Sequence, residues 1–184
     1  MRLSIIVPIY NERATAKALL DQVYALVLPG LEKEVIIVEA NSTDGTREIV
    51  KDYESRPGTT IIWEDRPHGK GAAVREGLKK VTGDFVVIQD GDLEYKVSEY
   101  PRLLEPLIKG ECEIVFGSRI IDSPQHWQFR RFKGLEAIYG LIINFGGVLF
   151  TTLFSLLYGT NLSDGATMFK LFRAKDLAGI TLRS

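Results

Sequence analysis

Short apolar runs recur along this chain, and stretches with helical spacing separate them. Five runs have the length of a β-strand, at residues 3–7, 35–38, 60–63, 85–88 and 113–116. Strands that alternate with helices are typical of an open sheet whose strands are mostly parallel. The sequence therefore predicts an α/β fold in which helices flank the sheet.

Apolar residues recur at helical spacing between these runs. The predicted helices cover residues 14–28, 46–53, 72–81 and 98–109, and a short helix follows from Ala174. Pro29 and Gly30 would end the first helix, and Thr43 or Asp44 would cap the second. A sixth strand is expected at residues 166–171.

The chain has 184 residues, a formal net charge of −1 and a pI of about 6.2. This length suits one domain with a single core, and no linker or internal repeat divides it. The charge excludes the basic surface of proteins that bind duplex nucleic acid. Cys112 is the only cysteine, and the first apolar run is too short for a secretory signal. We therefore expect a cytoplasmic protein without a nucleic-acid partner.

Polar, acidic and glycine residues follow each of the five predicted strands. These segments are residues 8–12, 39–45, 65–71, 90–92 and 117–119. The carboxyl ends of parallel strands meet at one edge of a sheet, and ligands of such folds bind outside that edge. The segments are therefore candidates for one shared binding site.

Two carboxylates flank a glycine after the fourth predicted strand, in the sequence Asp90-Gly91-Asp92. Two like charges this close repel each other, and a cation between them would offset this repulsion. Mg²⁺ and Mn²⁺ prefer oxygen ligands, and Mg²⁺ is usually held by one or two carboxylates together with substrate phosphates. Glu94 is a candidate for a further ligand. The alternative is a solvated acidic turn that caps the next helix.

The segment His68-Gly69-Lys70-Gly71 opens the third predicted helix. Glycines let the backbone approach a ligand, and a helix N-terminus favours anions, so Lys70 is a candidate contact for a diphosphate. The spacing fits neither the P-loop nor the dinucleotide-binding fingerprint. The alternative places Lys70 in solvent at an ordinary helix start, and His68 is interpreted as a loop residue.

Five motifs occur in order along the chain: VPIYNE at residues 7–12, NSTDGT at 41–46, GKGAA at 69–73, QDGDLEY at 89–95 and GSR at 117–119. Together they resemble the inverting GT-A glycosyltransferases of family 2, which include dolichyl- and polyprenyl-phosphate mannose and glucose synthases. The likeness covers essentially the whole chain. It implies a Rossmann-like GT-A fold and a hexose donor of the GDP- or UDP-sugar type.

The resemblance assigns roles to residues that follow the strands. Asp90 and Asp92 would hold Mg²⁺ or Mn²⁺ on the donor diphosphate, with Glu94 as a further ligand. The predicted nucleotide-sugar-binding residues are Pro8, Tyr10, Glu12, Glu39, Lys70, Asp90 and Gly91. The family commonly has two aspartates after the second strand, where this chain has Glu39 and Ala40. Glu39 can keep an acidic contact with the base or ribose, and Ala40 cannot.

Basic residues gather between residues 119 and 133, where Asp122 is the only residue of opposite charge. Arginine binds phosphate through paired hydrogen bonds, so this cluster favours an anionic acceptor over an ordinary solvated loop. By the resemblance, Arg119, Arg130 and Arg131 would contact the phosphate of the acceptor.

Residues 137–158 contain no charged side chain. Three interpretations compete: a buried core segment, a transmembrane helix, or one or two helices lying at a membrane surface. The basic cluster just before this segment favours the third, because membrane surfaces carry anionic headgroups. A polyprenyl phosphate would suit both the basic cluster and the apolar segment, because its phosphate could bind the arginines and its tail could contact the apolar helices.

Asp164 matches an aspartate that the family often has near the acceptor, and the alternative is a turn residue before the sixth strand. With it, the predicted catalytic residues are Asp92, Arg119 and Asp164. A phosphate acceptor needs little help from a base, because the second pKa of a phosphate monoester is about 6. A saccharide hydroxyl would need one.

The predicted function is metal-dependent, inverting transfer of mannose or glucose from a nucleotide diphosphate sugar to polyprenyl or dolichyl phosphate. The alternatives are a saccharide acceptor and a non-catalytic module that only binds nucleotide sugar. Residues 1–118 would form the nucleotide-sugar half of one domain, and residues 119–184 the acceptor and membrane-contacting half. We expect peripheral association with the cytoplasmic face of a membrane. The end at Ser184 is abrupt, which is typical of a partial chain.

Overall fold

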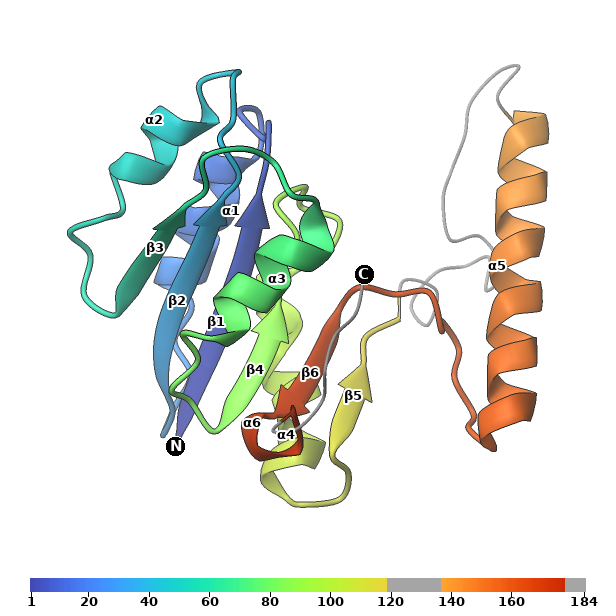
Figure 1. Ribbon diagram of the computed structural model, residues 1–184. Helices are drawn as coiled ribbons and strands as arrows, with labels where there is room; N and C mark the ends of the chain where they lie inside the picture. Colours follow the sequence, from blue (N-terminus) through green and yellow to red (C-terminus); the bar gives the residue numbers. More distant parts are fainter. Residues whose placement is uncertain (119–136, 178–184) are drawn as a thin grey trace. The chain divides into compact units, whose positions relative to one another are not determined.

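The computed structural model describes residues 1–118 and 137–177 (Figure 1). Its contacts divide the chain into two compact units. The first comprises Met1–Val115 together with the residues from Lys170 onward, and the second comprises Phe116–Phe169.

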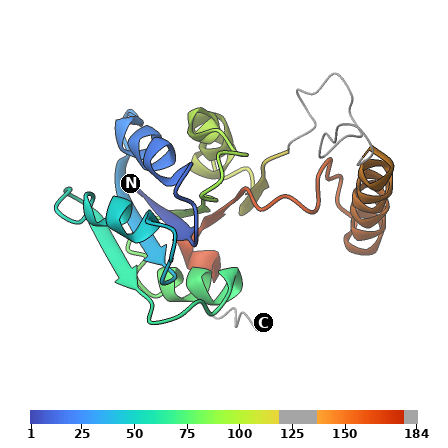
Figure 2. The ribbon, with the colours of Figure 1, turned by 90° about the horizontal axis from the view of Figure 1, so that it is seen from above.

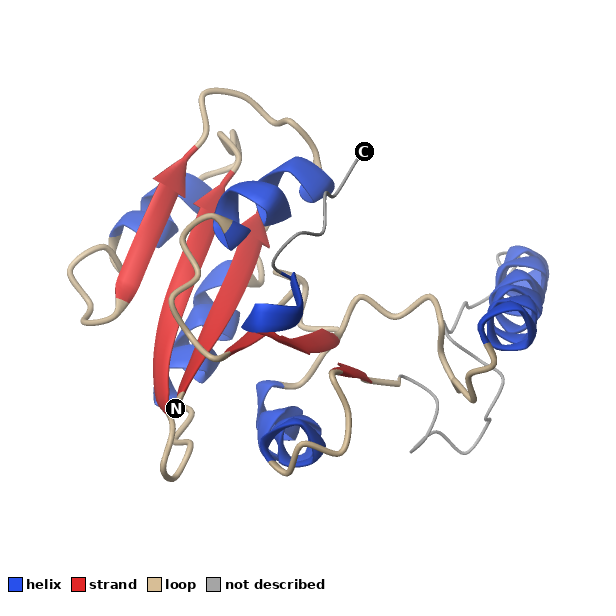
Figure 3. Ribbon diagram, turned by 60° about the horizontal axis from the view of Figure 1, so that its bottom comes forward, coloured by secondary structure: helices blue, strands red, loops and turns tan. Residues whose placement is uncertain are grey.

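A twisted sheet forms the centre of the first unit, with helices on both of its faces (Figure 3). The strand order is β3 (Thr59–Trp63), β2 (Glu32–Glu39), β1 (Arg2–Ile9), β4 (Phe85–Ile88), β6 (Lys170–Arg173) and β5 (Ile114–Phe116). The pairs among the first four of these strands are parallel, and β6 runs antiparallel to β4. The prediction of an α/β sheet with parallel strands is confirmed for these four.

The sixth strand begins later than predicted, at Lys170 instead of residue 166. The Thr167 hydroxyl accepts the N–H of Phe169 at 3.1 Å, a local bond that competes with strand pairing.

Two groups of helices cover the sheet (Figures 1 and 2). α3 (Lys70–Leu78) and α6 (Ala174–Leu177) cover the face on which Ile6, Ile36 and Val86 form a core cluster. The opposite face is covered by α1 (Ala16–Ala25), with α2 (Thr46–Lys51) packed against it, and by α4 (Tyr100–Ile108), which follows a 3-10 turn at Val97–Glu99. α3 lies close to the sheet because Gly77 has no side chain: a Cβ there would meet Ile6 Cγ2 at 2.5 Å.

Local contacts explain where the helices begin and end. α1 ends at Ala25, earlier than predicted, and Lys33 Nζ donates hydrogen bonds to the carbonyls of Val23, Tyr24 and Leu26 at that end. These bonds satisfy carbonyls that have no partner within the helix. α3 begins at Lys70, before the predicted residue 72, directly after Gly69 with its positive φ of 85°.

The Asp44 carboxylate accepts the N–H of Thr46 at 3.0 Å at the start of α2. Of the two residues predicted to cap this helix, Asp44 makes the contact.

The second unit contains one long helix, α5 (Ala137–Tyr158). Five of its polar or small residues recur along one side at a helical spacing of three or four residues: Gly140, Asn144 and Thr151 are buried, and Gly147 and Ser155 are half-buried. The Thr151 hydroxyl accepts the N–H of Gly165 at 3.1 Å, and the Ser155 hydroxyl accepts that of Leu162 at 3.4 Å. We refer to these five residues as the polar stripe.

The large apolar side chains of α5 lie outward. The most exposed are Ile142, Phe145, Leu156, Leu157 and Tyr158, with 65–79% of their surface accessible. The interpretation of this segment as buried core is therefore wrong for its described residues. No helix in the described part of the chain has both the length and the apolar character needed to cross a membrane.

Candidate functional site

A pocket of about 260 Å³ lies at the carboxyl edge of the sheet in the first unit. Its walls come from four places: the end of β1, the end of β2, the loop from β3 into α3, and the turn after β4. The lining residues are Pro8, Ile9, Tyr10, Glu12, Ala40, Pro67, Gly69, Lys70, Ala73, Asp90, Gly91 and Asp92. The predicted shared site at the strand ends is therefore present as a concave surface.

Unusual backbone conformations occur where these strands end. Asn11, Asn41 and Leu93 are the only non-glycine residues with positive φ in the described ranges, at 54°, 56° and 61°. Asparagine adopts this conformation more readily than most residues, whereas leucine rarely does. Such strain persists only where the surroundings hold it, and it gathers at functional sites.

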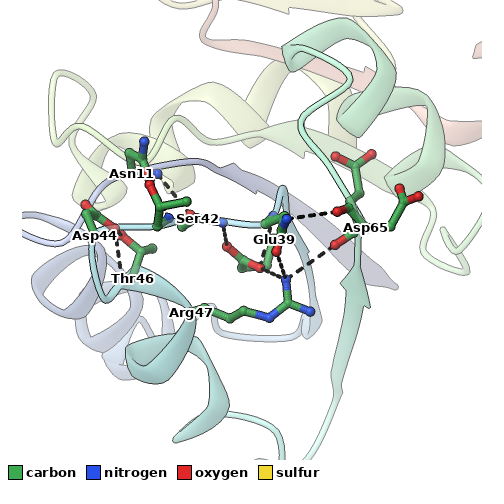
Figure 4. A network of polar contacts seen from close by, with 10 residues as sticks. Asn11, Glu39, Ser42, Asp44, Thr46, Arg47 and Asp65 are labelled. Carbon is green, nitrogen blue, oxygen red and sulfur yellow. Dashed lines mark hydrogen bonds and ion pairs between the residues drawn. The ribbon is translucent and has the colours of Figure 1, made fainter.

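Hydrogen bonds tie the end of β1 to the end of β2 (Figure 4). The Asn11 N–H donates to the Ser42 hydroxyl at 3.0 Å, and the Thr43 N–H donates to Asn11 Oδ1 at 2.9 Å. The Glu12 N–H donates to the Thr46 hydroxyl at 2.9 Å. These contacts fix the two loops that carry the pocket residues Tyr10, Glu12 and Ala40.

Glu39, the last residue of β2, is not among the residues that line the pocket, whereas Ala40 directly after it is. Its side chain is fully buried and pairs with the Arg47 guanidinium at 2.8 Å (Figure 4). The N–H groups of Asn41 and Ser42 donate to the same carboxylate, at 3.2 and 2.7 Å. Both carboxylate oxygens thus have protein partners, while Ala40 lines the pocket.

Opposite charges meet inside the pocket. Lys70 Nζ forms an ion pair with Asp90 Oδ1, and the two side chains are 41% and 13% exposed. Glu12 accepts a hydrogen bond from the Thr15 hydroxyl at 2.7 Å. Asp92 is exposed and accepts the N–H of Glu94 at 3.1 Å. The pocket therefore combines carboxylates, one ammonium group and the N-terminus of α3.

The predicted metal ligands are only partly brought together. Asp90 and Asp92 both line the pocket, and Glu94 is exposed and does not. Within residues 1–118 and 137–177, no three carboxylate, histidine or cysteine side chains cluster as a metal site. Two carboxylates still suit a divalent ion that takes its remaining ligands from substrate phosphate and water.

Two carboxyl groups beyond the end of β3 have shifted pKa values. Burial raises the pKa of Glu64, whose Oε2 has no hydrogen-bond partner among the described residues. A hydrogen bond from His68 lowers the pKa of the neighbouring Asp65 carboxyl, with 3.3 Å between Nε2 and Oδ1. His68 is thus a loop residue held by Asp65.

Four residues were predicted to act on the acceptor. Arg119, Arg130 and Arg131 fall outside the described residues. Asp164 lies in the second unit, in the connection after α5, and only 1% of its surface is exposed.

The pocket also contains Ile9, Pro67 and Ala73, which lie in the predicted segments and motifs but had no individual role assigned to them. Ala73 lies three residues after Lys70 on α3, so helical spacing from Lys70 could have placed it on the same side. Ile9 and Pro67 carry no polar group that would have marked them.

The model of the family "Glycosyl transferase family 2" matches residues 4–180 of this chain. A dolichol-phosphate mannosyltransferase from Pyrococcus furiosus is 32% identical over 133 residues, which cover 71% of this chain and 37% of that protein. An undecaprenyl-phosphate 4-deoxy-4-formamido-L-arabinose transferase from Edwardsiella ictaluri is 30% identical over 174 residues, which cover 93% and 49%. The chain spans about a third to a half of the length of the curated relatives it matches.

Solved structures share the fold. Mannosyl-3-phosphoglycerate synthase from Rubrobacter xylanophilus superposes with a TM-score of 0.73 at 20% identity, covering 98% of this chain and 55% of that one. Glucosyl-3-phosphoglycerate synthase from Mycobacterium tuberculosis, in a complex with Mn²⁺ and UDP, gives 0.65 at 23% identity, covering 97% and 58%. Since the family model covers nearly the whole chain, this protein belongs to glycosyl transferase family 2.

Proposed function

We propose that this chain is the catalytic part of a metal-dependent, inverting glycosyltransferase. It would move a hexose from a nucleotide diphosphate sugar to a polyprenyl or dolichyl phosphate. The observation that carries the proposal is the pocket in which Asp90, Asp92 and Lys70 meet at the carboxyl edge of a parallel sheet. Two relatives that are at least 30% identical are named as sugar transferases, one with dolichol phosphate and the other with undecaprenyl phosphate in its name.

Asp90 and Asp92 are the residues that would hold Mg²⁺ or Mn²⁺. Their carboxylates are the ligand type that both ions prefer, and Asp90 Oδ1 is a buried oxygen whose charge is compensated by the Lys70 ammonium group. When bound, the ion would neutralise charge on the diphosphate that leaves. Glu94 is proposed as a contact to its water shell, because Glu94 is exposed and two residues away from Asp92.

The proposed reaction is one in-line displacement at the anomeric carbon. An oxygen of the acceptor phosphate forms the new bond to that carbon, and the bond between sugar and diphosphate breaks, which inverts the configuration. The nucleoside diphosphate leaves with the bonding electron pair. Lys70 and the N-terminus of α3 would stabilise its negative charge, as cations and helix N-termini do for anions.

The remaining pocket residues would bind the nucleoside. Pro8 and Ile9, the last two residues of β1, form one wall together with Tyr10, and Tyr10 is 45% exposed and able to pack on a base or ribose. Glu12 would contact the donor, with its orientation fixed by Thr15. Glu39 is proposed to act indirectly, because its buried pair with Arg47 supports the loop that carries Ala40.

The second unit is proposed to contact the lipid. The large apolar side chains of α5 lie outward and its polar stripe lies inward, a pattern that leaves the apolar side chains available to contact the acyl chains at a membrane surface. Arg119, Arg130 and Arg131 precede this helix in sequence and are proposed to bind the acceptor phosphate. We propose association with the cytoplasmic face of a membrane.

The alternative with a saccharide acceptor gives Asp164 a larger role, because a sugar hydroxyl needs a base. Asp164 is buried in the second unit, and the two interpretations of it, a residue near the acceptor and a structural turn residue, both stay open. A module that binds nucleotide sugar without transfer is the other alternative, and Ala40 is the residue that favours it.

The test is release of nucleoside diphosphate from UDP- and GDP-hexoses with Mn²⁺, in detergent micelles. One set of reactions contains polyprenyl phosphate, and the matched set contains free saccharides. We expect release only with the lipid phosphate, loss of at least about 100-fold in Asp92→Ala, and a much smaller loss in Asp164→Asn. Release of nucleoside diphosphate only with saccharides would show that the acceptor is a saccharide and not a lipid phosphate. Binding of nucleotide sugar without any release would support the non-catalytic binding module.

A further inference from the structure

The only basic residue among those that line the pocket is Lys70, and its ammonium group lies on Asp90. Asp90 Oδ1 is buried and receives no hydrogen bond from the described part of the chain, so this ion pair is its only compensation. A buried carboxylate oxygen without a partner is costly, which makes the ion pair important while no ligand is bound. The Lys70 ammonium group therefore supplies, in the empty pocket, the positive charge that a metal ion bound to Asp90 would supply.

Lys70 is also placed to leave that position. It is the first residue of α3, directly after Gly69, and 41% of its side chain is exposed. The N–H groups at this helix start favour an anion, so a diphosphate bound there would attract the ammonium group by rotation of the side chain alone. Asp90 would then lose one cation and be available to another.

We propose that Lys70 and the divalent ion exchange at Asp90, so that the ion binds tightly only together with the donor diphosphate. This inference rests on the proposed function, because it needs a nucleoside diphosphate in the pocket. Lys70 is a positioning residue in this scheme: it compensates Asp90 in the empty pocket and the diphosphate in the filled one. Free metal binds weakly because the ammonium group both occupies Asp90 and repels a second cation.

The test measures Mn²⁺ affinity without nucleotide, from the loss of the electron paramagnetic resonance signal of free Mn²⁺. Lys70→Met should raise this affinity about fivefold or more, because it removes a competing ion pair and a repelling charge. Lys79→Met is the matched control, since it removes the same charge at the other end of α3, where Lys79 pairs with Glu76. Lys79→Met and the conservative Lys70→Arg should bind Mn²⁺ as the native chain does.

The second measurement is the Kd of UDP and GDP at saturating Mn²⁺. Lys70→Met should weaken it about tenfold, so that one substitution changes metal and nucleotide affinity in opposite directions. An unchanged or lower Mn²⁺ affinity in Lys70→Met, with folding verified by circular dichroism, would overturn the exchange. If neither nucleotide binds the native chain, the proposed function fails, and the nucleotide-free titration still decides whether Lys70 competes with metal.

Discussion

The two units of this chain place polar and apolar side chains in opposite ways. In the first unit, apolar residues such as Ile6, Ile36 and Val86 are buried between the sheet and α3, and charged residues lie at the rim. In α5 of the second unit, Asn144 and Thr151 are buried while Leu156 and Leu157 are exposed. The first arrangement suits water as the surroundings, and the second suits lipid.

Under the proposed function, this contrast separates two tasks along one chain. The first unit holds the proposed donor pocket, whose position is fixed because hydrogen bonds tie the ends of β1 and β2 together and a parallel sheet supports them. The second unit presents an apolar helix whose inward contacts are polar. A donor that is dissolved in water and an acceptor that is dissolved in membrane would need such a division.

The largest expected effect compares two apolar residues. Ile36→Ala should lower the free energy of unfolding by about 2–5 kcal/mol, because Ile36 is buried in the core. Leu156→Ala should change it by less than about 0.5 kcal/mol, because 75% of Leu156 is exposed. Chemical denaturation of both variants in aqueous buffer measures the difference. Equal losses would mean that α5 packs as ordinary core and that the contrast is false.

The next effect concerns the polar stripe. Thr151→Val should lower the free energy of unfolding by about 1–3 kcal/mol, because it leaves the buried Gly165 N–H without its acceptor. Thr152→Val is the control, since Thr152 is exposed and its hydroxyl bonds only within α5, to the Val148 carbonyl. Thermal unfolding distinguishes them. A stable Thr151→Val would show that the stripe is not held by its hydrogen bonds.

A smaller effect is expected on membrane binding. Replacing both Leu156 and Leu157 with serine should weaken association with vesicles of mixed neutral and anionic lipids by about tenfold, because two exposed apolar side chains lose their burial in lipid. Flotation of the vesicles measures the bound fraction. The paired control replaces Thr59 and Thr60, on β3 of the first unit, with serine. Equal vesicle binding by both double variants would mean that the exposed leucines of α5 do not contact lipid.

The smallest effect tests the buried Glu64. Burial raises its pKa in the folded chain, so the unfolded chain loses this proton at lower pH. Ionisation of Glu64 therefore destabilises the folded chain. This loss of stability grows as the pH rises through the pKa of the unfolded chain, and it is complete above the pKa of the folded chain. Glu64→Gln should therefore raise the midpoint of thermal unfolding slightly at pH 7 and leave it unchanged near pH 3.5. A lower midpoint at pH 7 would mean that the charged carboxylate is stabilised by a partner.

Much of the fold follows from the sequence, because apolar runs of strand length that alternate with helices indicate a buried parallel sheet. The rim residues Pro8, Tyr10, Lys70, Asp90 and Asp92 were predictable for the same reason: Pro8 lies at the carboxyl end of β1, the other four follow strands, and parallel strands end at one edge. Their meeting in one pocket is a consequence of topology.

Other features depend on tertiary contacts that no local pattern encodes. Glu39 and Ala40 are neighbours at the end of β2, and no local pattern encodes that Glu39 pairs with Arg47 of α2 while Ala40 lines the pocket. The polar stripe of α5 was visible as scattered polar and glycine residues, but its inward direction depends on contacts with residues 162–165. The antiparallel strand β6 returns from far along the chain, so its place beside β4 has no local signal.

The central claim is that the rim pocket binds a nucleoside diphosphate through a metal held by Asp90 and Asp92. Isothermal titration of UDP and GDP into the chain, with Mn²⁺ and with chelator, tests it most directly, using Asp92→Asn as the matched variant. We predict that one nucleotide binds with Mn²⁺, that its affinity falls at least about tenfold with chelator, and that Asp92→Asn causes a similar loss. Equal binding with and without Mn²⁺, or an unchanged Asp92→Asn, would contradict the claim.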